Sequence, residues 1–74
     1  MVNEKKLLRA LGQQIKAARK AGGLTQETLA ELCDFDPTYV SLLERGLRNP
    51  PFLTICKLAD KLGWPLKKLF DDVG

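Results

Sequence analysis

The side chains that could do chemistry gather between residues 26 and 49, and they carry hydroxyl, amide and guanidinium groups. Hydroxyls and amides exchange hydrogen bonds with polar partners, whereas guanidinium groups pair with anions. The chain has no histidine, no glycine-rich phosphate loop and no cluster of carboxylates beside a nucleophile. It therefore predicts recognition of a partner and no enzymatic activity. The polar residues concerned are Gln26, Thr38, Tyr39, Ser41, Arg45, Arg48 and Asn49.

Two cysteines are the remaining reactive groups. Cys33 and Cys56 occupy apolar positions of predicted helices, which favours buried free thiols, because an unpaired cysteine behaves as a small hydrophobic residue. A metal site needs about four ligands, and two sulfurs without an imidazole do not supply them. We therefore expect no metal and no cofactor. A redox-sensing cysteine pair is the alternative.

Length and composition indicate one globular domain, residues 1–74. The chain is 45% hydrophobic and 28% charged, which is ordinary for a globular protein with a small core. No apolar run approaches the roughly 20 residues of a membrane helix, and the N-terminus lacks the small-residue cleavage site of a secretory signal. We expect a cytoplasmic protein without a membrane partner, and a disulfide is disfavoured in that compartment.

Positive and negative charges are separated along the chain. Residues 1–24 hold six basic side chains and one acid, residues 25–44 hold five acids and no basic side chain, and residues 45–74 hold six basic side chains and three acids. A surface that binds phosphate groups has to be basic. For such a partner, the positive charge must come from the flanks of the central segment.

The elements that must position these side chains are all helices. Apolar spacing of three and four residues predicts helices over 4–21, 26–33, 37–45, about 51–62 and 65–70, which together make a compact all-α bundle of five helices. Expected caps are Asn3, Thr25 and Asp36, the last followed by Pro37 at a first-turn position that favours proline. Glycines at 22–23, 46 and 63 are expected to end helices.

Residues 25–46 predict two short helices joined by a tight turn at Asp34 and Phe35. Val40 and Leu43 should face inward, which leaves Thr38, Tyr39, Ser41 and Leu42 on or near the outer arc of the second helix. That arc could read a partner by hydroxyl and apolar contacts, or it could be an ordinary solvated helix face.

Three stretches carry a family resemblance: GLTQETLAELC, DPTYVSLLERGLRNP and LTICKLADKLGWPLKKLF. At these separations they resemble the helix-turn-helix of the lambda-repressor-like superfamily, with its Cro, phage-repressor and Xre-type regulators. The resemblance covers about residues 8–70. The TYVSLLERGLRNP stretch is also similar to small controller proteins of restriction–modification systems, although it occurs in Xre-type regulators generally.

The resemblance implies a transcriptional regulator that binds double-stranded DNA as a homodimer on a pseudo-palindromic operator. The helix at 37–45 would enter the major groove. Gln26 stands where the family places a glutamine near a phosphate or base. The resemblance places Pro37, Thr38, Tyr39 and Leu42 at base-contacting positions, and Arg45, Arg48 and Asn49 in the segment that follows the DNA backbone. In some members, positions equivalent to Arg19 and Glu44 form a buried ion pair.

Three departures from the family pattern affect these expectations. Asp34 replaces a glycine that is often left-handed, a conformation that Asp tolerates better than most residues. Pro37 has no donor and cannot make the bidentate base contact of a basic or amide side chain. Pro51 and Pro65 replace Ser or Thr caps, so they supply no side-chain cap.

Two further expectations concern partners. Apolar residues near the end of the chain exceed what a small core needs, and part of this surface is predicted to form a dimer interface: Phe52, Leu53, Leu66, Phe70 and Val73. With no room for a sensor domain we expect no small-molecule ligand, so autoregulation through protein concentration is favoured. The alternative function is a protein-interaction module, antitoxin-like or a scaffold, which the acidic residues 25–44 would favour. Lys16 and Lys20 could neutralise phosphates or simply be solvated.

Overall fold

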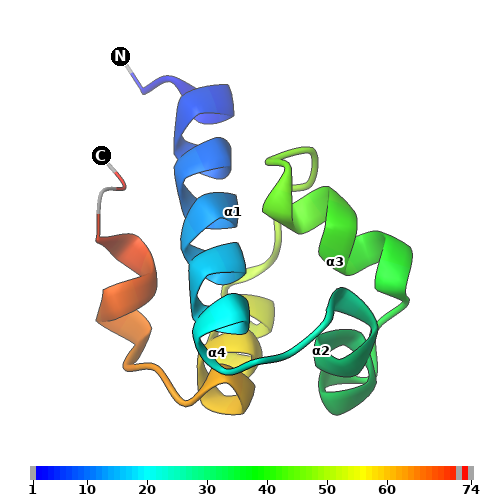
Figure 1. The fold of residues 1–74 in the computed structure, drawn as a ribbon. Coiled ribbons are helices and arrows are strands. Elements are labelled where there is room, and N and C mark those ends of the chain that lie inside the picture. Colours follow the sequence, from blue (N-terminus) through cyan, green and yellow to red (C-terminus); the bar gives the residue numbers. More distant parts are fainter. Residues whose placement is uncertain (1, 72, 74) are drawn as a thin grey trace.

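The computed structural model describes residues 2–71 and 73, and these form a bundle of helices without a strand. The elements in chain order are α1 (Glu4–Ala21), α2 (Gln26–Cys33), α3 (Pro37–Glu44), α4 (Phe52–Leu62) and the 3₁₀ helix η1 (Leu66–Phe70). In Figure 1, α1 stands between η1 on one side and α3 on the other, with α2 and α4 below them. The all-α prediction is confirmed.

The prediction of five α-helices is wrong for the last element. Leu66–Phe70 is a 3₁₀ helix of five residues, and the Lys68 amide donates to the Pro65 carbonyl at 2.9 Å in the three-residue pattern of such helices. Pro65 makes no side-chain cap, as expected. An uncapped segment this short gains too few hydrogen bonds to build an α-helix, so the bundle has four α-helices and this turn.

The predicted caps of the first three helices are confirmed. Asn3 Oδ1 accepts from the Lys6 amide at 3.1 Å, Thr25 Oγ1 accepts from the Thr28 amide at 3.0 Å, and Asp36 Oδ1 accepts from the Thr38 amide at 2.7 Å. Each bond satisfies a backbone donor that has no partner within its own helix. Pro51 makes no cap at the start of α4.

The turn between α2 and α3 fixes their angle. Asp34 adopts the left-handed conformation, with φ 58° and ψ 44°, and its amide donates to the Glu31 carbonyl at 3.2 Å. The expectation that aspartate would substitute for glycine here is therefore confirmed. The next amide, of Phe35, donates to the Ala30 carbonyl at 2.8 Å, so the turn ends α2 and starts α3 within three residues.

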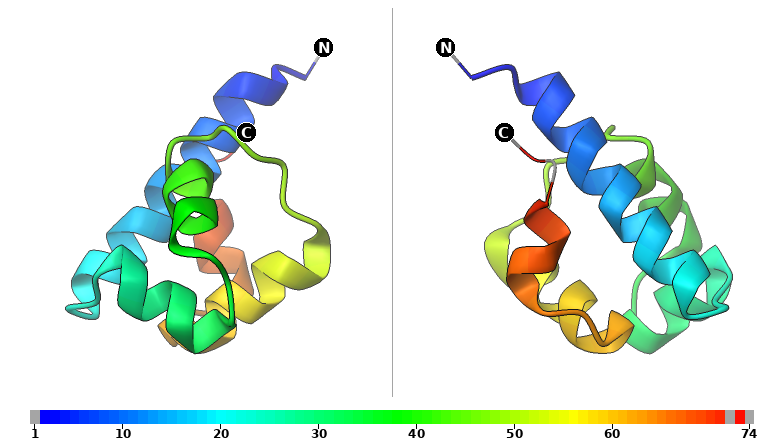
Figure 2. Two further views of the ribbon diagram at one scale, coloured as in Figure 1. Left: turned by 90° about the vertical axis from the view of Figure 1, so that its right-hand side faces the viewer. Right: turned by 60° about the vertical axis from the view of Figure 1, so that its left-hand side comes forward.

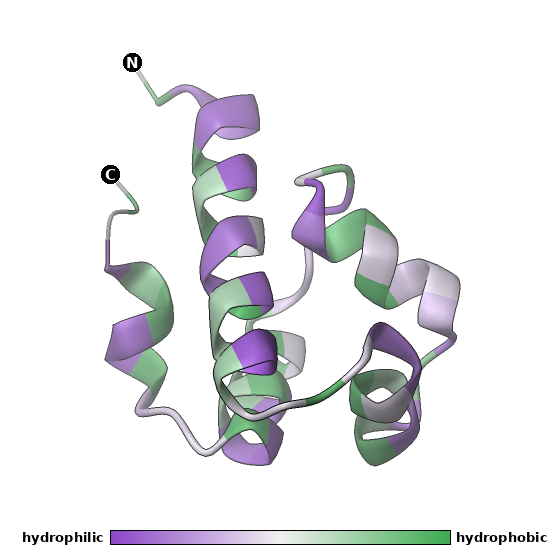
Figure 3. Ribbon diagram, viewed as in Figure 1, coloured by the Kyte–Doolittle hydropathy of each residue, from purple (hydrophilic) through white to green (hydrophobic). Residues whose placement is uncertain are grey.

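Each helix contributes an apolar face to one core. In Figure 3, η1 is hydrophilic on its outer side and hydrophobic on the side toward α1. Among the expected core positions Cys33 is buried, but Cys56 is only half-buried, and both thiols are free. The core consists of Leu11, Ile15, Leu29, Ala30, Cys33, Val40, Leu43, Ile55, Leu58, Ala59 and Leu69.

Helices α1 and α3 approach each other with their backbones almost in contact at Gly12. A Cβ added to Gly12 would lie 2.4 Å from the Leu43 carbonyl oxygen and 2.6 Å from that of Glu44. Only a residue without a side chain allows this approach, so Gly12 sets the distance between α1 and α3.

None of the described helices is both long enough and apolar enough to cross a membrane.

Candidate nucleic-acid interface

Helix α3 lies on the outside of the bundle, with α2 below it in Figure 1 and α1 behind it in the left view of Figure 2. Its inner face buries Val40 and Leu43, as predicted. Its outer face exposes Pro37 and Thr38 and leaves Ser41 half-buried. The capping aspartate positions this face, because it begins the helix directly before Pro37.

Besides Ser41, two further residues of the predicted outer arc are less exposed than the sequence indicated. Leu42, expected on the outer arc, is half-buried. Tyr39 is also half-buried, because its ring packs edge-on against Phe35 with the centroids 5.3 Å apart at 86°. The reason is that the tight turn folds Phe35 back beside α3, where Lys57 covers its other side with Nζ 5.3 Å from the ring centroid.

A buried ion pair connects α1 to the C-terminal end of α3, which confirms that expectation. Arg19 Nε donates to Glu44 Oε2 at 2.6 Å, and Arg19 Nη2 donates to Glu44 Oε1 at 3.0 Å. The hydrogen bond to Glu44 raises the pKa of Arg19, so the guanidinium stays charged although it is 8% exposed. A third bond, from Arg19 Nη1 to the Leu24 carbonyl at 2.9 Å, fixes the chain that leads into α2.

Gln26 joins this network from the first position of α2. Its Nε2 donates to Glu44 Oε1 at 3.1 Å, and the residue remains partly exposed. The amide of Gln26 is therefore held against α3 at the start of α2, and one carboxylate orders side chains from three helices.

The outer face of α3 is electrically neutral. Glu44 is the only charged residue of the helix, and it is buried against Arg19. Figure 3 shows strongly hydrophilic colour only at the C-terminal end of α3. Positive charge near this face must come from the segment that follows.

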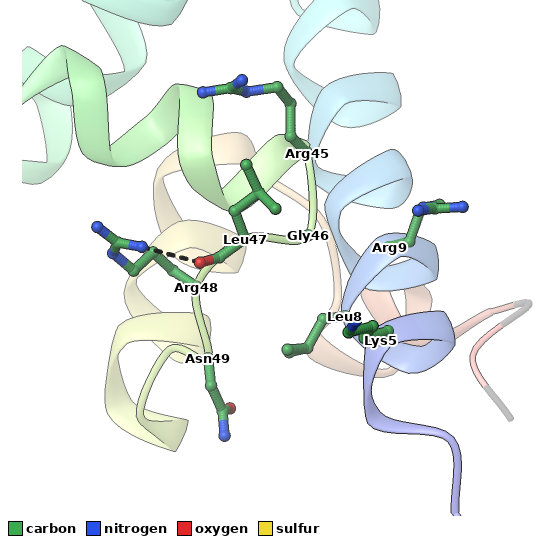
Figure 4. Close-up of a pocket in the computed structure, with 8 residues that line it drawn as sticks. All are labelled: Lys5, Leu8, Arg9, Arg45, Gly46, Leu47, Arg48 and Asn49. Atoms are coloured by element: carbon green, nitrogen blue, oxygen red, sulfur yellow. Dashed lines mark hydrogen bonds between the residues drawn. The ribbon is translucent and has the colours of Figure 1, made fainter.

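That segment, residues 45–49, borders a basic cleft. Arg45, Arg48 and Asn49, the residues predicted to follow a DNA backbone, are exposed. Figure 4 shows how the segment faces the first turns of α1 across the cleft. We define the basic cleft by its lining residues, Lys5, Leu8, Arg9, Arg45, Gly46, Leu47, Arg48 and Asn49.

Sequence reasoning missed Lys5 and Arg9 as part of this surface, and it named Lys16 and Lys20 instead. Lys16 and Lys20 are exposed but do not line the basic cleft. One signal was available: Lys5 and Arg9 are four residues apart, so they share a helix face. The sequence pattern does not show which end of α1 lies beside the segment after α3, because this depends on the tertiary packing.

The cysteines offer no competing metal site. In residues 2–71 and 73, no three His, Cys, Asp or Glu side chains are grouped so that they could hold a metal ion. Burial raises the pKa of the Cys33 thiol, so its reactive thiolate form is disfavoured.

Comparison with known proteins gives consistent matches. A family described as Helix-turn-helix matches residues 15–69. The control protein C.BamHI of Bacillus amyloliquefaciens is 39% identical over 72 residues, which cover 96% of this chain and 86% of that protein. The crystal structure of the restriction-modification controller protein C.AhdI from Aeromonas hydrophila shares 44% identity and a TM-score of 0.82, covering 85% of this chain and 96% of that one.

A second solved structure includes DNA. It is the restriction-modification controller protein C.Esp1396I, crystallised as a tetramer in complex with its natural 35 base-pair operator. It shares 31% identity with this chain at a TM-score of 0.79, and the match covers 90% of this chain and 88% of that one.

Proposed function

The chain belongs to the helix-turn-helix family of DNA-binding transcriptional regulators, and on that premise we propose that it acts as a homodimer on a pseudo-palindromic operator. The observation that carries the proposal is the outer face of α3, which is neutral, partly exposed and followed directly by exposed arginines. Such a helix brings no exposed charge of its own into the major groove, while the arginines hold phosphates at its end.

The side chains of this surface divide between two tasks. Thr38 and Ser41 supply hydroxyls that can bond to base edges, and Pro37 and Leu42 supply apolar contact for a thymine methyl. Tyr39 presents its partly exposed ring beside them. None of these contacts adds charge, so they distinguish sequences more than they attract DNA.

Attraction is assigned to the residues around α3. Arg45, Arg48 and Asn49 are exposed after its C-terminal end and would hold the sugar-phosphate backbone. Gln26 lies at the N-terminus of α2, where the positive end of the helix dipole favours an anion. In the free protein its amide nitrogen bonds to Glu44, which pre-orients the side chain.

The homodimer is proposed to form through the start of α4. Phe52 is 61% exposed and Leu53 is 78% exposed, and two adjacent apolar side chains in water favour burial against a second copy. Sedimentation at tens of micromolar protomer should show a dimer for the wild type and a monomer for Leu53→Glu. Leu32→Glu, at an exposed apolar site on α2, is the control and should remain dimeric. A monomeric wild type would contradict the proposal.

Regulation and location follow from the same proposal. Two recognition helices in adjacent major grooves require half-sites roughly 34–36 Å apart. Occupancy of the operator then depends on protein concentration through dimerisation, so we propose that the protein regulates its own gene. We also place it in the cytoplasm. No catalytic step is included.

The competing function is a protein-interaction module. It is favoured by exposed acids on and after α2, namely Glu27, Glu31 and Asp34. A basic or mixed protein surface could bind these acids without DNA. The test below separates the two functions, because a module of this kind would select no DNA sequence.

Selection of bound duplexes from random DNA, followed by affinity measurements at several salt concentrations, tests the regulator. We expect a motif with two-fold symmetry and an affinity that falls steeply with salt. Arg48→Ala should weaken binding and reduce the slope of log affinity against log salt by about 0.9, the value for one phosphate. Lys67→Ala, on η1, removes the same charge outside the surface and should change the slope little. Failure to enrich any motif would refute the proposal.

A further inference from the structure

The basic cleft contains two cations, Lys5 and Arg9, that the proposed function does not use. We propose that it binds backbone phosphates of the same operator, so that Lys5 and Arg9 of α1 belong to the DNA-binding surface together with Arg45 and Arg48. The inference rests on the proposed function and extends the DNA contact from the helix-turn-helix to the first turns of α1.

The four cations of the cleft have no acidic neighbour in its lining. Lys5 and Arg9 are a like-charged pair on one helix face, an arrangement that destabilises an isolated helix. Within residues 2–71 and 73, the hydrogen bond of the Arg48 side chain is to the adjacent Leu47 carbonyl, with 3.0 Å between Nη1 and the oxygen. Among the described residues, no carboxylate forms an ion pair with any of these four side chains. An anion would relieve this repulsion.

The cations border the cleft from two sides. In Figure 4, Arg45 and Arg48 extend from the segment after α3, Leu8 points from α1 toward that segment, and Arg9 extends from the other side of α1. All four basic side chains are exposed. Arg9 points away from the cleft in Figure 4, so its long exposed side chain has to turn back across α1 to meet a linear polyanion there.

The spacing between the two sides is fixed at Gly46. This residue has φ 73°, and a Cβ added to it would lie 2.8 Å from both the Cα and the nitrogen of Arg9 and 3.1 Å from the carbonyl carbon of Leu8. The backbone after α3 thus rests directly on the backbone of α1. Arg45 therefore directly precedes the residue that touches the helix turn carrying Arg9.

DNA is the occupant favoured by continuity with the interface. Arg45, Arg48 and Asn49 line the cleft and also belong to the surface proposed to follow the DNA backbone. A duplex carries about one negative charge per 1.7 Å along its axis, so a strand seated on the arginines brings further phosphates to α1. Asn49 precedes Phe52 by three residues, and Phe52 is proposed to lie at the dimer interface. The phosphates concerned therefore lie between the two half-sites.

The test compares two double variants that lose the same charge. Lys5→Gln with Arg9→Gln should reduce the slope of log affinity against log salt by roughly 0.9–1.8, the value for one or two phosphates. Ethylation interference at phosphates between the half-sites should also disappear. Lys61→Gln with Lys67→Gln, at exposed sites on α4 and η1, should leave both measurements unchanged. A third variant, Lys5→Arg with Arg9→Lys, keeps the charge and should restore the wild-type slope.

The outcomes separate the inference from the proposed function. If the wild type enriches no operator, the proposed function fails. If the Lys5→Gln, Arg9→Gln variant selects the wild-type operator with an unchanged slope and interference pattern, the inference alone is overturned. Binding of inorganic pyrophosphate at the cleft with DNA affinity unaffected by these substitutions would also overturn it, because the site would then serve a small anion. Matching unfolding temperatures for all variants confirm that exposed side chains were changed without loss of the fold.

Discussion

Replacing Gly12 with alanine should destabilise the protein, although alanine is the better helix former. In an exposed helix interior, this exchange stabilises by about 1 kcal/mol. Here the new Cβ would meet the Leu43 carbonyl oxygen at 2.4 Å, whereas ordinary contact begins at 3.4 Å. Helices α1 and α3 would have to separate by about 1 Å, since a backbone carbonyl cannot rotate away as a side chain can.

The size of the effect follows from two opposing contributions. Overpacking a well-packed core costs typically about 1–3 kcal/mol, and contact with two backbone carbonyls places Gly12→Ala at the upper end. After subtraction of the helix-propensity gain, we expect a net loss of about 2 kcal/mol. That is a large fraction of the total for a small domain, for which stability is about 0.05–0.15 kcal/mol per residue. Movement at Glu44 would also stretch its bonds to Arg19.

Thermal unfolding followed by far-ultraviolet circular dichroism measures this loss. For a domain of this length, 2 kcal/mol lowers the midpoint by about 8–16 °C. All samples need the same protomer concentration, because dimerisation raises the midpoint by mass action. Gly22→Ala is the matched control, since its Cβ would have its nearest neighbour at 3.6 Å and its φ is −86°. Equal midpoints for Gly12→Ala and Gly22→Ala would refute the argument that the α1–α3 distance requires glycine.

Three further predictions address other parts of the molecule. Glu44→Ala should cost about 3–5 kcal/mol by leaving Arg19 buried and unpaired, whereas the double variant Arg19→Met, Glu44→Leu should lose much less; additive losses in urea unfolding would contradict the pairing. Thr38→Ala should change the preferred base at one position of each half-site and leave the salt slope unchanged, and an unaltered selected motif would remove Thr38 from the base-reading residues. Iodoacetamide should modify half-buried Cys56 before buried Cys33, whose raised pKa opposes thiolate formation; mass spectrometry of the peptides reads the order. Because burial raises the pKa of Cys33, the unfolded chain loses the thiol proton at a lower pH than the folded protein does. The stability of the fold therefore falls as the pH rises above the ordinary thiol pKa of about 8.5.

Much of the fold could be predicted because its determinants are local. A capping side chain and its amide are two or three residues apart, as with Asn3, Thr25 and Asp36, so these helix starts are encoded in short stretches. The last element was predicted wrongly for a related reason. Apolar spacing over 65–70 fits either helix type, and the small number of residues decided for the 3₁₀ form.

The surface was harder to predict because it depends on packing between distant segments. Tyr39 is half-buried against Phe35 of the turn, and Leu42 lies half-buried on a helix that packs against α1 and α2. The cleft pairs residues 5–9 with residues 45–49, and no pattern within either segment shows that they meet. The buried pair of Arg19 and Glu44 was anticipated only through family resemblance, since their separation of 25 residues carries no periodic signal.

The neutrality of the outer face of α3 also determines how the protein would search a genome. In the proposed complex, cations around the helix would hold any duplex regardless of sequence, while uncharged side chains such as Thr38 would sample base edges without adding to that hold. A protein built this way can slide along non-specific DNA and stop where the hydroxyls find partners. A higher ionic strength would then shorten the residence of the protein on specific and non-specific DNA by similar factors. The ratio of the two affinities would stay nearly constant, while the rate of the search would change.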